Sequence, residues 1–255
     1  MRATITGLRA LGALCALLLA TAGCTSRDGS AQARAGGTST GTGPATGTDA
    51  AKGGGSGGDA SVPLTAPELE RAALATGDLP GFQVSAGRSV LSPTGQPRAD
   101  KAECQPLADA MGEHPDPRAG HTVDRGLGSL DDLGLAVSTS LSSYRETDAE
   151  ALIGGLEAAI AACGGGFGAT LDGRGATYRE VKAVSFSARG GDEAVSWTTV
   201  AADEAAVAPV HVVVVRKGAT VARFTAFDLA GRKPPRVPEE VVGEQLAKVA
   251  RQLAR

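Results

Sequence analysis

Hydrophobic residues recur with the spacing of amphipathic helices in several separate segments of the chain. The helices expected from this spacing span 66–76, 99–111, 148–163 and 238–253. Thr65 with Glu68 and Thr147 with Glu150 have the spacing of a capping box, which favours a helix start at each position. The apolar positions therefore predict four amphipathic helices, one of them at the C-terminal end.

Elsewhere the apolar and polar residues alternate with a period of two, which is typical of half-buried strands. The expected strands span 83–85, 133–142, 178–188, 193–201, 209–216 and 221–228. Val212 to Val215 has no polar alternation, which predicts a central strand covered on both faces. Lys217-Gly218 is expected to form the hairpin turn that follows it. The proline-containing segment His114 to Gly128 and the glycine-rich segment Gly164 to Gly175 are expected to be loops.

Consecutive strands joined by short turns pair antiparallel. We therefore predict an α+β fold, with an antiparallel sheet meander and flanking helices in a single two-layer domain. Aromatic residues make up only 3% of the chain, so the core is expected to consist mainly of Val, Leu, Ile and Ala. Trp197 alternates with Val195 and is expected to pack in that core. The predicted globular domain spans residues 64–255.

The N-terminal segment has the features of an export signal. Arg2 and Arg9 precede the apolar run LGALCALLLATA. This run is shorter than the roughly 20 residues that span a bilayer. Thr21-Ala22-Gly23-Cys24 resembles the bacterial lipobox, in which small residues precede a cysteine that is lipidated after cleavage. We predict a lipoprotein signal peptide at 1–23 and a diacylglyceryl and palmitate-type lipid on Cys24. The alternative is a secreted protein with a coincidental cysteine.

Residues 24–63 form the predicted lipidated cysteine and its linker. The segment is rich in Gly, Ser, Thr and Ala and contains too few apolar side chains to offset the entropy of ordering. A flexible chain of this composition has an end-to-end distance of about 35 Å. The run GGGSGG lacks the GK[ST] of a phosphate-binding loop, so that interpretation is rejected. We expect a domain tethered to the cell membrane at its extracytoplasmic face.

The net charge argues against nucleic acid as a partner. The formal charge of −3 becomes −5 once Arg2 and Arg9 leave with the signal peptide. Phosphates attract basic surfaces, so neither nucleic acid nor a polybasic membrane contact is expected.

The chain has four cysteines. Cys15 leaves with the signal peptide and Cys24 takes the lipid, which leaves Cys104 and Cys163 in an oxidising compartment. Because both lie on apolar faces of expected helices, we predict a disulfide between the second and third helices. A redox-active thiol, which needs CxxC spacing or an exposed low-pKa group, and a metal site are the weaker alternatives.

Several segments together resemble actinobacterial envelope lipoproteins of the PknH-like extracellular sensor-domain type, over about 64–253. They are LPGF at 79–82, CQPL at 104–107, ACGGGF at 162–167, GDEA at 191–194 and VVVRKG at 213–218. The resemblance implies an antiparallel sheet with helices, disulfides and a cleft for a ligand. It also implies an extracytoplasmic sensor-like role.

No motif of a hydrolase, metalloprotease or calcium-binding loop occurs, so neither catalytic residues nor a cofactor are expected and the chain is predicted not to be an enzyme. The remaining alternatives involve isolated polar residues. They are a metal site or a solvated loop at His114, Asp116, His121 and Asp124, paired carboxylates at Glu113, Asp131 and Asp132, and a packed histidine at His211. We predict no metal site.

Three hypotheses about function follow. The first is a lipid-anchored binding or sensor-like domain for an unknown small ligand or envelope partner, which an apolar cavity of roughly 300 Å³ or more would favour. The second is a scaffold or chaperone-like lipoprotein without a pocket, acting through protein–protein contacts. The third, and weakest, is a hydrolase of unrecognised type.

Overall fold

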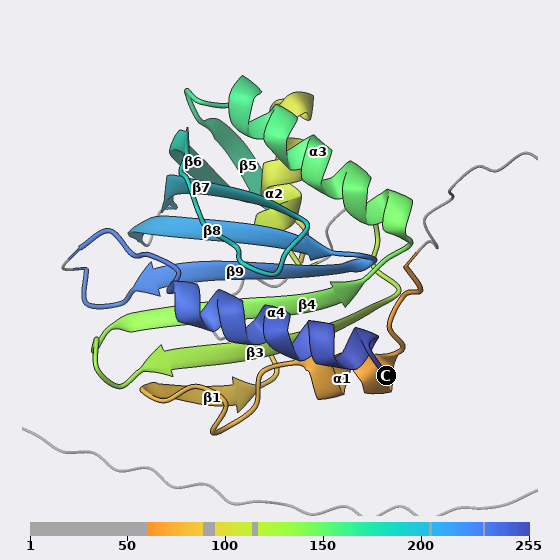
Figure 1. The fold of residues 1–255 in the computed structure, drawn as a ribbon. Coiled ribbons are helices and arrows are strands. Elements are labelled where there is room, and N and C mark those ends of the chain that lie inside the picture. Colours follow the sequence, from red (N-terminus) through yellow and green to blue (C-terminus); the bar gives the residue numbers. More distant parts are fainter. Residues whose placement is uncertain (1–60, 89–94, 114–116, 204–205, 232) are drawn as a thin grey trace, which may run out of the picture. The chain divides into compact units, whose positions relative to one another are not determined.

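The computed structural model describes residues 61–88, 95–113, 117–203, 206–231 and 233–255. They belong to one compact unit, built on an antiparallel sheet of nine strands in the order β1-β3-β4-β9-β8-β7-β6-β5-β2 (Figure 1). The five consecutive strands β5 to β9 form a continuous meander.

The strands are β1 (Phe82–Ala86), β2 (Arg98–Ala99), β3 (His121–Ser129), β4 (Leu135–Ser143), β5 (Phe167–Leu171), β6 (Arg174–Ala183), β7 (Glu193–Ala202), β8 (Val207–Lys217) and β9 (Thr220–Asp228). The helices are α1 (Ala66–Ala72), η1 (Ala102–Cys104, a 3₁₀ turn), α2 (Gln105–Met111), α3 (Glu146–Ala162) and α4 (Glu239–Leu253).

Helices cover both faces of the sheet. Val212 and Val214 of β8 pack into a core beneath α2 and α3, whereas Val213 and Val215 pack into a second core beneath α1 and α4. In Figure 1, α4 accordingly crosses the near face of the sheet and α2 lies behind it. The predicted antiparallel α+β domain and its central, doubly covered strand are confirmed. The layers number three rather than the two expected, because successive side chains of a strand point to opposite faces and here both faces are apolar.

The predicted disulfide is confirmed. Cys104 at the start of α2 is bonded to Cys163 at the end of α3, with the two Cα atoms 5.9 Å apart. Both cysteines are buried, and so is Trp197, as expected. The bond joins the two helices that cover one face of the sheet.

Two segments expected to be loops are strands. Residues 121–128 lie in β3, where pairing with β1 and β4 stabilises a polar sequence that has little strand signal of its own. Residues 167–171 and 174–175 belong to the β5–β6 hairpin. Its turn, Asp172-Gly173, has positive φ at both positions, as a type I′ turn requires. The Asp-Gly pair was the available sequence signal for that hairpin.

The first helix ends earlier than expected, at Ala72 instead of Thr76. The side-chain amide of Gln245 on α4 donates to the carbonyl of Ala72 and accepts from the N–H of Leu74. Arg125 of β3 donates to the carbonyl of Leu74. Tertiary partners therefore take the backbone groups that another helical turn would have used.

The second helix starts later than expected. Residues 98–99 pair with β5, and the helix begins only at Gln105. The side chain of Gln105 accepts from the N–H of Ala99 and donates to the carbonyl of Pro97, which holds the preceding segment in its non-helical path.

Candidate functional site

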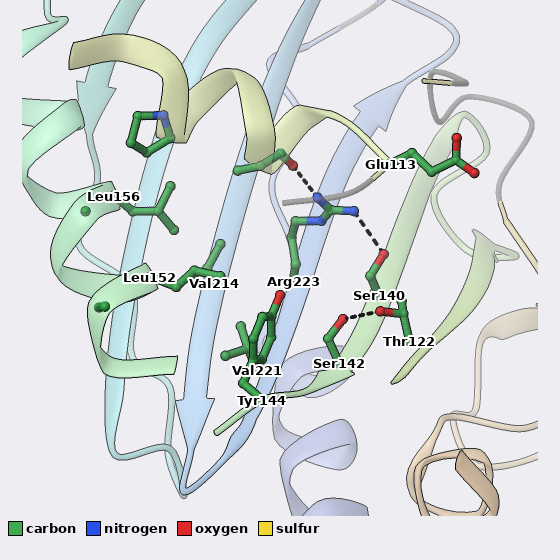
Figure 2. A pocket seen from close by; sticks show the side chains of 14 residues that line it. Glu113, Thr122, Ser140, Ser142, Tyr144, Leu152, Leu156, Val214, Val221 and Arg223 are labelled. Atoms are coloured by element: carbon green, nitrogen blue, oxygen red, sulfur yellow. Dashed lines mark hydrogen bonds between the residues drawn. The ribbon is translucent and has the colours of Figure 1, made fainter. Parts of the chain in front are cut away.

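A cavity of about 200 Å³ lies between α2, α3 and the sheet face formed by β4, β9 and β8. One wall is apolar and is formed by Pro106, Ala110, Ala151, Leu152, Leu156, Val214 and Val221. The other wall is polar and carries Thr122, Ser140, Ser142, Tyr144 and Arg223, with Glu113 at its edge. Figure 2 shows Leu152 and Leu156 entering from α3 opposite the side chains of the sheet. The cavity is therefore amphipathic.

Arg223 of β9 is the one cationic side chain in this cavity wall. Its Nη1 donates to the carbonyls of Ala110 (2.7 Å) and Gly112 (3.2 Å) at the end of α2. Its Nη2 donates to Ser140 Oγ (3.1 Å; Figure 2). Within the described part of the chain, no carboxylate lies within ion-pair distance of this guanidinium. Burial lowers the pKa of Arg223, and the nearby Tyr144 and Asp124 partly offset that effect. The site therefore holds a largely buried positive charge whose direct partners are neutral.

Hydroxyl groups surround the guanidinium. Ser140 donates to Asp124 Oδ1 at 2.6 Å and so stands between that carboxylate and Arg223. Ser142 and Thr122 share a hydrogen bond of 2.9 Å. Burial raises the pKa of the Tyr144 phenol, although the charge of Arg223 and the hydroxyl of Ser142 oppose the shift. Tyr144 consequently stays a neutral phenol at physiological pH.

Further cavities adjoin the first along the same face of the sheet. A small one of about 20 Å³ shares Ala110 and Arg223 with it. The small cavity in turn shares Met111 and Phe227 with another of about 250 Å³. The first cavity is smaller than the roughly 300 Å³ that would favour a small-molecule site, and its neighbours are separate cavities that share lining residues with it.

Sequence reasoning missed this site, although a signal was present. In β9 the alternate residues Ala222, Phe224 and Ala226 face the core beneath α4, so Arg223 must face the other side, which α2 covers. An arginine at an inward-facing position of a central strand marks an unusual buried charge. Ser140 and Ser142 of β4 are buried on the same face of the sheet.

A Ser–His pair elsewhere in the sheet lacks the geometry of a nucleophile and its base. Ser196 Oγ lies 2.8 Å from His211 Nε2, while His211 Nδ1 accepts the N–H of Val237 at 2.9 Å. Because Nδ1 is the acceptor, neutral His211 carries its proton on Nε2 and donates it to Ser196. The histidine is packed in the core, as predicted, and cannot take a proton from the serine.

The other candidate residues are not brought together. His114 and Asp116 lie outside the described residues, as does Cys24, and the described residues contain no group of three metal-ligating side chains. Glu113 pairs with Arg88 (2.6 Å), and Asp132 pairs with Lys233 (2.8 Å). In the part of the chain that the structure describes, no helix is long and apolar enough to cross a bilayer.

These observations define a class: a disulfide-linked α+β domain whose antiparallel sheet lies between two helical layers, with an amphipathic cavity on one face. The fold is similar to that of the extracellular domain of PknH from Mycobacterium tuberculosis, at a TM-score of 0.46 and 14% sequence identity. That similarity covers 76% of this chain and 98% of the PknH domain.

An uncharacterised protein from Mycobacterium smegmatis, an Rv0999 ortholog, is also similar, at a TM-score of 0.39 and 18% identity. The similarity covers 67% of this chain and 88% of that protein. No family model and no curated protein matches the chain. At these identities the similarities concern the fold.

Proposed function

We propose that this protein is a lipid-anchored, extracytoplasmic, sensor-like domain that binds a small ligand in the cavity between α2, α3 and the sheet, and that it has no catalytic activity. The single observation that supports ligand binding is the largely buried guanidinium of Arg223, which hydrogen-bonds neutral acceptors only, in a half-apolar cavity with Glu113 at its edge. Buried charges are normally paired, so a cavity that encloses one without a direct counter-charge favours a bound partner.

The anchor is the second part of the proposal. Residues 21–24 have the lipobox pattern, and the sulfur of Cys24 can carry a diacylglyceryl group. One acyl chain gives only marginal membrane binding, whereas two chains hold a protein stably. Cys104 and Cys163 form a disulfide, a bond that persists in oxidising compartments and supports export.

One experiment tests both parts. The protein is extracted from its native membranes in mild detergent and analysed by native mass spectrometry. We expect a mature N-terminus at Cys24 that carries a diacylglyceryl mass, and a non-covalent small molecule on the domain. An unmodified start elsewhere would overturn the anchor.

A pair of variants tests whether the small molecule found by mass spectrometry lies in this cavity. Gly155 of α3 lines the cavity, and a Cβ added there meets nothing within 4 Å. Gly155→Leu therefore projects a side chain into the cavity and is expected to remove the bound molecule. Gly154→Leu, next to it on the exposed side of the same helix, is the matched control and is expected to retain it. A molecule equally retained by both variants would contradict binding in this cavity.

A second candidate function is supported by a separate observation. Leu130, Leu133 and Leu229 are 60%, 71% and 63% exposed, and they lie at the end of the sheet where β4 begins and β9 ends. The N–H of Leu229 donates to the carbonyl of Gly134, which holds the two loops together. Exposed apolar groups of this kind mark protein contacts. A domain that emerges from native membranes without any small molecule would favour this scaffold function.

A further inference from the structure

We propose that the ligand is a monocarboxylate with an unbranched apolar chain, whose carboxylate pairs with Arg223 and whose chain lies in the cavity between α2, α3 and the sheet. The proposal specifies the chemistry of the binding function proposed above and depends on it.

The charge of the head group follows from the partners of Arg223. A guanidinium has five N–H donors, and the three hydrogen bonds described use neutral acceptors only. Nε–H and one N–H of Nη2 have no acceptor among the described residues. Two such groups form the fork that fits a carboxylate.

The neighbouring carboxylates leave room for one negative charge. Asp124 is separated from the guanidinium by Ser140, whose hydroxyl it accepts. Glu113 pairs with Arg88, accepts the N–H of Gly95 and points away from Arg223 in Figure 2. Because these two carboxylates already lie near the guanidinium, a monoanion fits the site better than a phosphate dianion, whose second charge they would repel.

The apolar chain of the ligand is inferred from the side chains that line the cavity. Opposite Arg223, the lining side chains are aliphatic, with Leu152, Leu156, Val214 and Val221 the largest. Tyr144 is the only aromatic residue that lines this cavity, and Tyr178 and Phe227 line the adjoining ones, so the wall between Arg223 and α3 is mainly aliphatic. The cavity of about 20 Å³ that shares Ala110 and Arg223 with the first one leaves room there for a thin chain and not for a compact ring.

Calorimetry with two matched probes tests the proposal. Decanoate and decanol have the same chain and differ in the charge of the head group. The protein is the full mature chain from residue 24 with Cys24→Ser, which removes the acyl groups that would compete with the probes. We expect decanoate to bind about ten- to a hundredfold more tightly than decanol, as hydrogen bonds to charged groups allow.

Three variants distinguish recognition of the carboxylate from binding of the apolar chain. Gly155→Leu is expected to lower the affinity for both probes at least tenfold, while Gly154→Leu leaves both unchanged. Arg223→Gln is expected to abolish the preference for decanoate and to leave decanol binding intact. The preference ratio reports on charge recognition and does not change if the variant is merely less stable. The Gly155 and Gly154 pair keeps the test valid if Arg223→Gln does not fold.

The outcomes distinguish the two proposals. Equal affinities for decanoate and decanol, both lost in Gly155→Leu, would overturn the carboxylate and leave ligand binding in place. Failure of both probes to bind would overturn the acyl-carboxylate ligand, while the molecule captured from native membranes still decides the proposed function.

Discussion

At the scale of single residues, buried polar groups in this domain are matched to specific partners. Among the described residues, Thr220 Oγ1 is the one fully buried side-chain polar atom without a hydrogen bond. His211, 1% exposed, has both ring nitrogens occupied, by Ser196 and by the N–H of Val237. That arrangement requires the neutral ring, because Nδ1 must accept. Burial, with a smaller contribution from Arg236, lowers the pKa of His211 to about 4.

This pKa predicts how stability depends on pH. Above pH 6.5 the ring is neutral in both states, so the full stability is present. As the pH falls from 6.5 to about 4, the unfolded state binds a proton that the folded state refuses, and stability is lost by up to about 3 kcal/mol. Urea unfolding at several pH values measures this slope. His211→Asn retains an acceptor for the N–H of Val237, and its free energy of unfolding is expected to depend less on pH. An unchanged pH dependence in this variant would contradict the attribution to His211.

At the scale of elements, α2 depends on its tertiary connections. It has only seven residues, which is too short for a stable isolated helix. The disulfide joins its start to α3, and Arg223 donates hydrogen bonds to the carbonyls of Ala110 and Gly112 at its C-terminal end. The element that covers the candidate site is thus held at both ends by side chains from elsewhere in the fold.

The disulfide gives a second prediction. The cross-link spans 59 residues, and in the chain-entropy model closing such a loop contributes about 4 kcal/mol, an upper value for native bonds. Replacing both cysteines, Cys104→Ala with Cys163→Ala, is expected to lower the free energy of unfolding by about 2–4 kcal/mol in urea titrations. Reduction of the wild-type protein should lower it to a similar extent. An unchanged midpoint in both experiments would mean that the bond does not constrain the unfolded chain.

At the scale of the whole molecule, one sheet joins two cores. Adjacent valines of β8 belong to opposite cores, so neither helical layer can be lost without exposing one face of the same strand. We therefore expect the domain from residue 61 onward to unfold as one cooperative unit.

Trp197, the single tryptophan, reports on this coupling because it lies in the core beneath α2 and α3. Leu246 of α4 is buried in the opposite core. Leu246→Ala is expected to cost about 2–5 kcal/mol and to shift the fluorescence transition of Trp197 as much as the far-ultraviolet circular dichroism transition. Gly243→Ala in the same helix, where an added Cβ meets nothing within 4 Å, is the control and should not destabilise the domain. A tryptophan transition unaffected by Leu246→Ala would show that the two layers unfold separately.

The sequence was sufficient for elements whose side chains alternate with a clear period. The meander β6 to β9, helix α4 and the doubly covered valines of β8 were all predictable, because burial of apolar side chains enforces those periods. The disulfide was predictable by elimination, since Cys104 and Cys163 are the two cysteines outside the predicted signal peptide and the predicted lipidation site.

Only the tertiary structure decided the rest. β3 is a strand because β1 and β4 supply its hydrogen bonds, and α1 stops at Ala72 because Gln245 takes its next backbone groups. The site arises in the same way. Arg223, Ser140 and the end of α2 are far apart along the chain; sheet register pairs Arg223 with Ser140, and the disulfide with helix packing brings α2 to them. Local periodicity determines which residues are buried, whereas pairing between distant segments determines which of them meet.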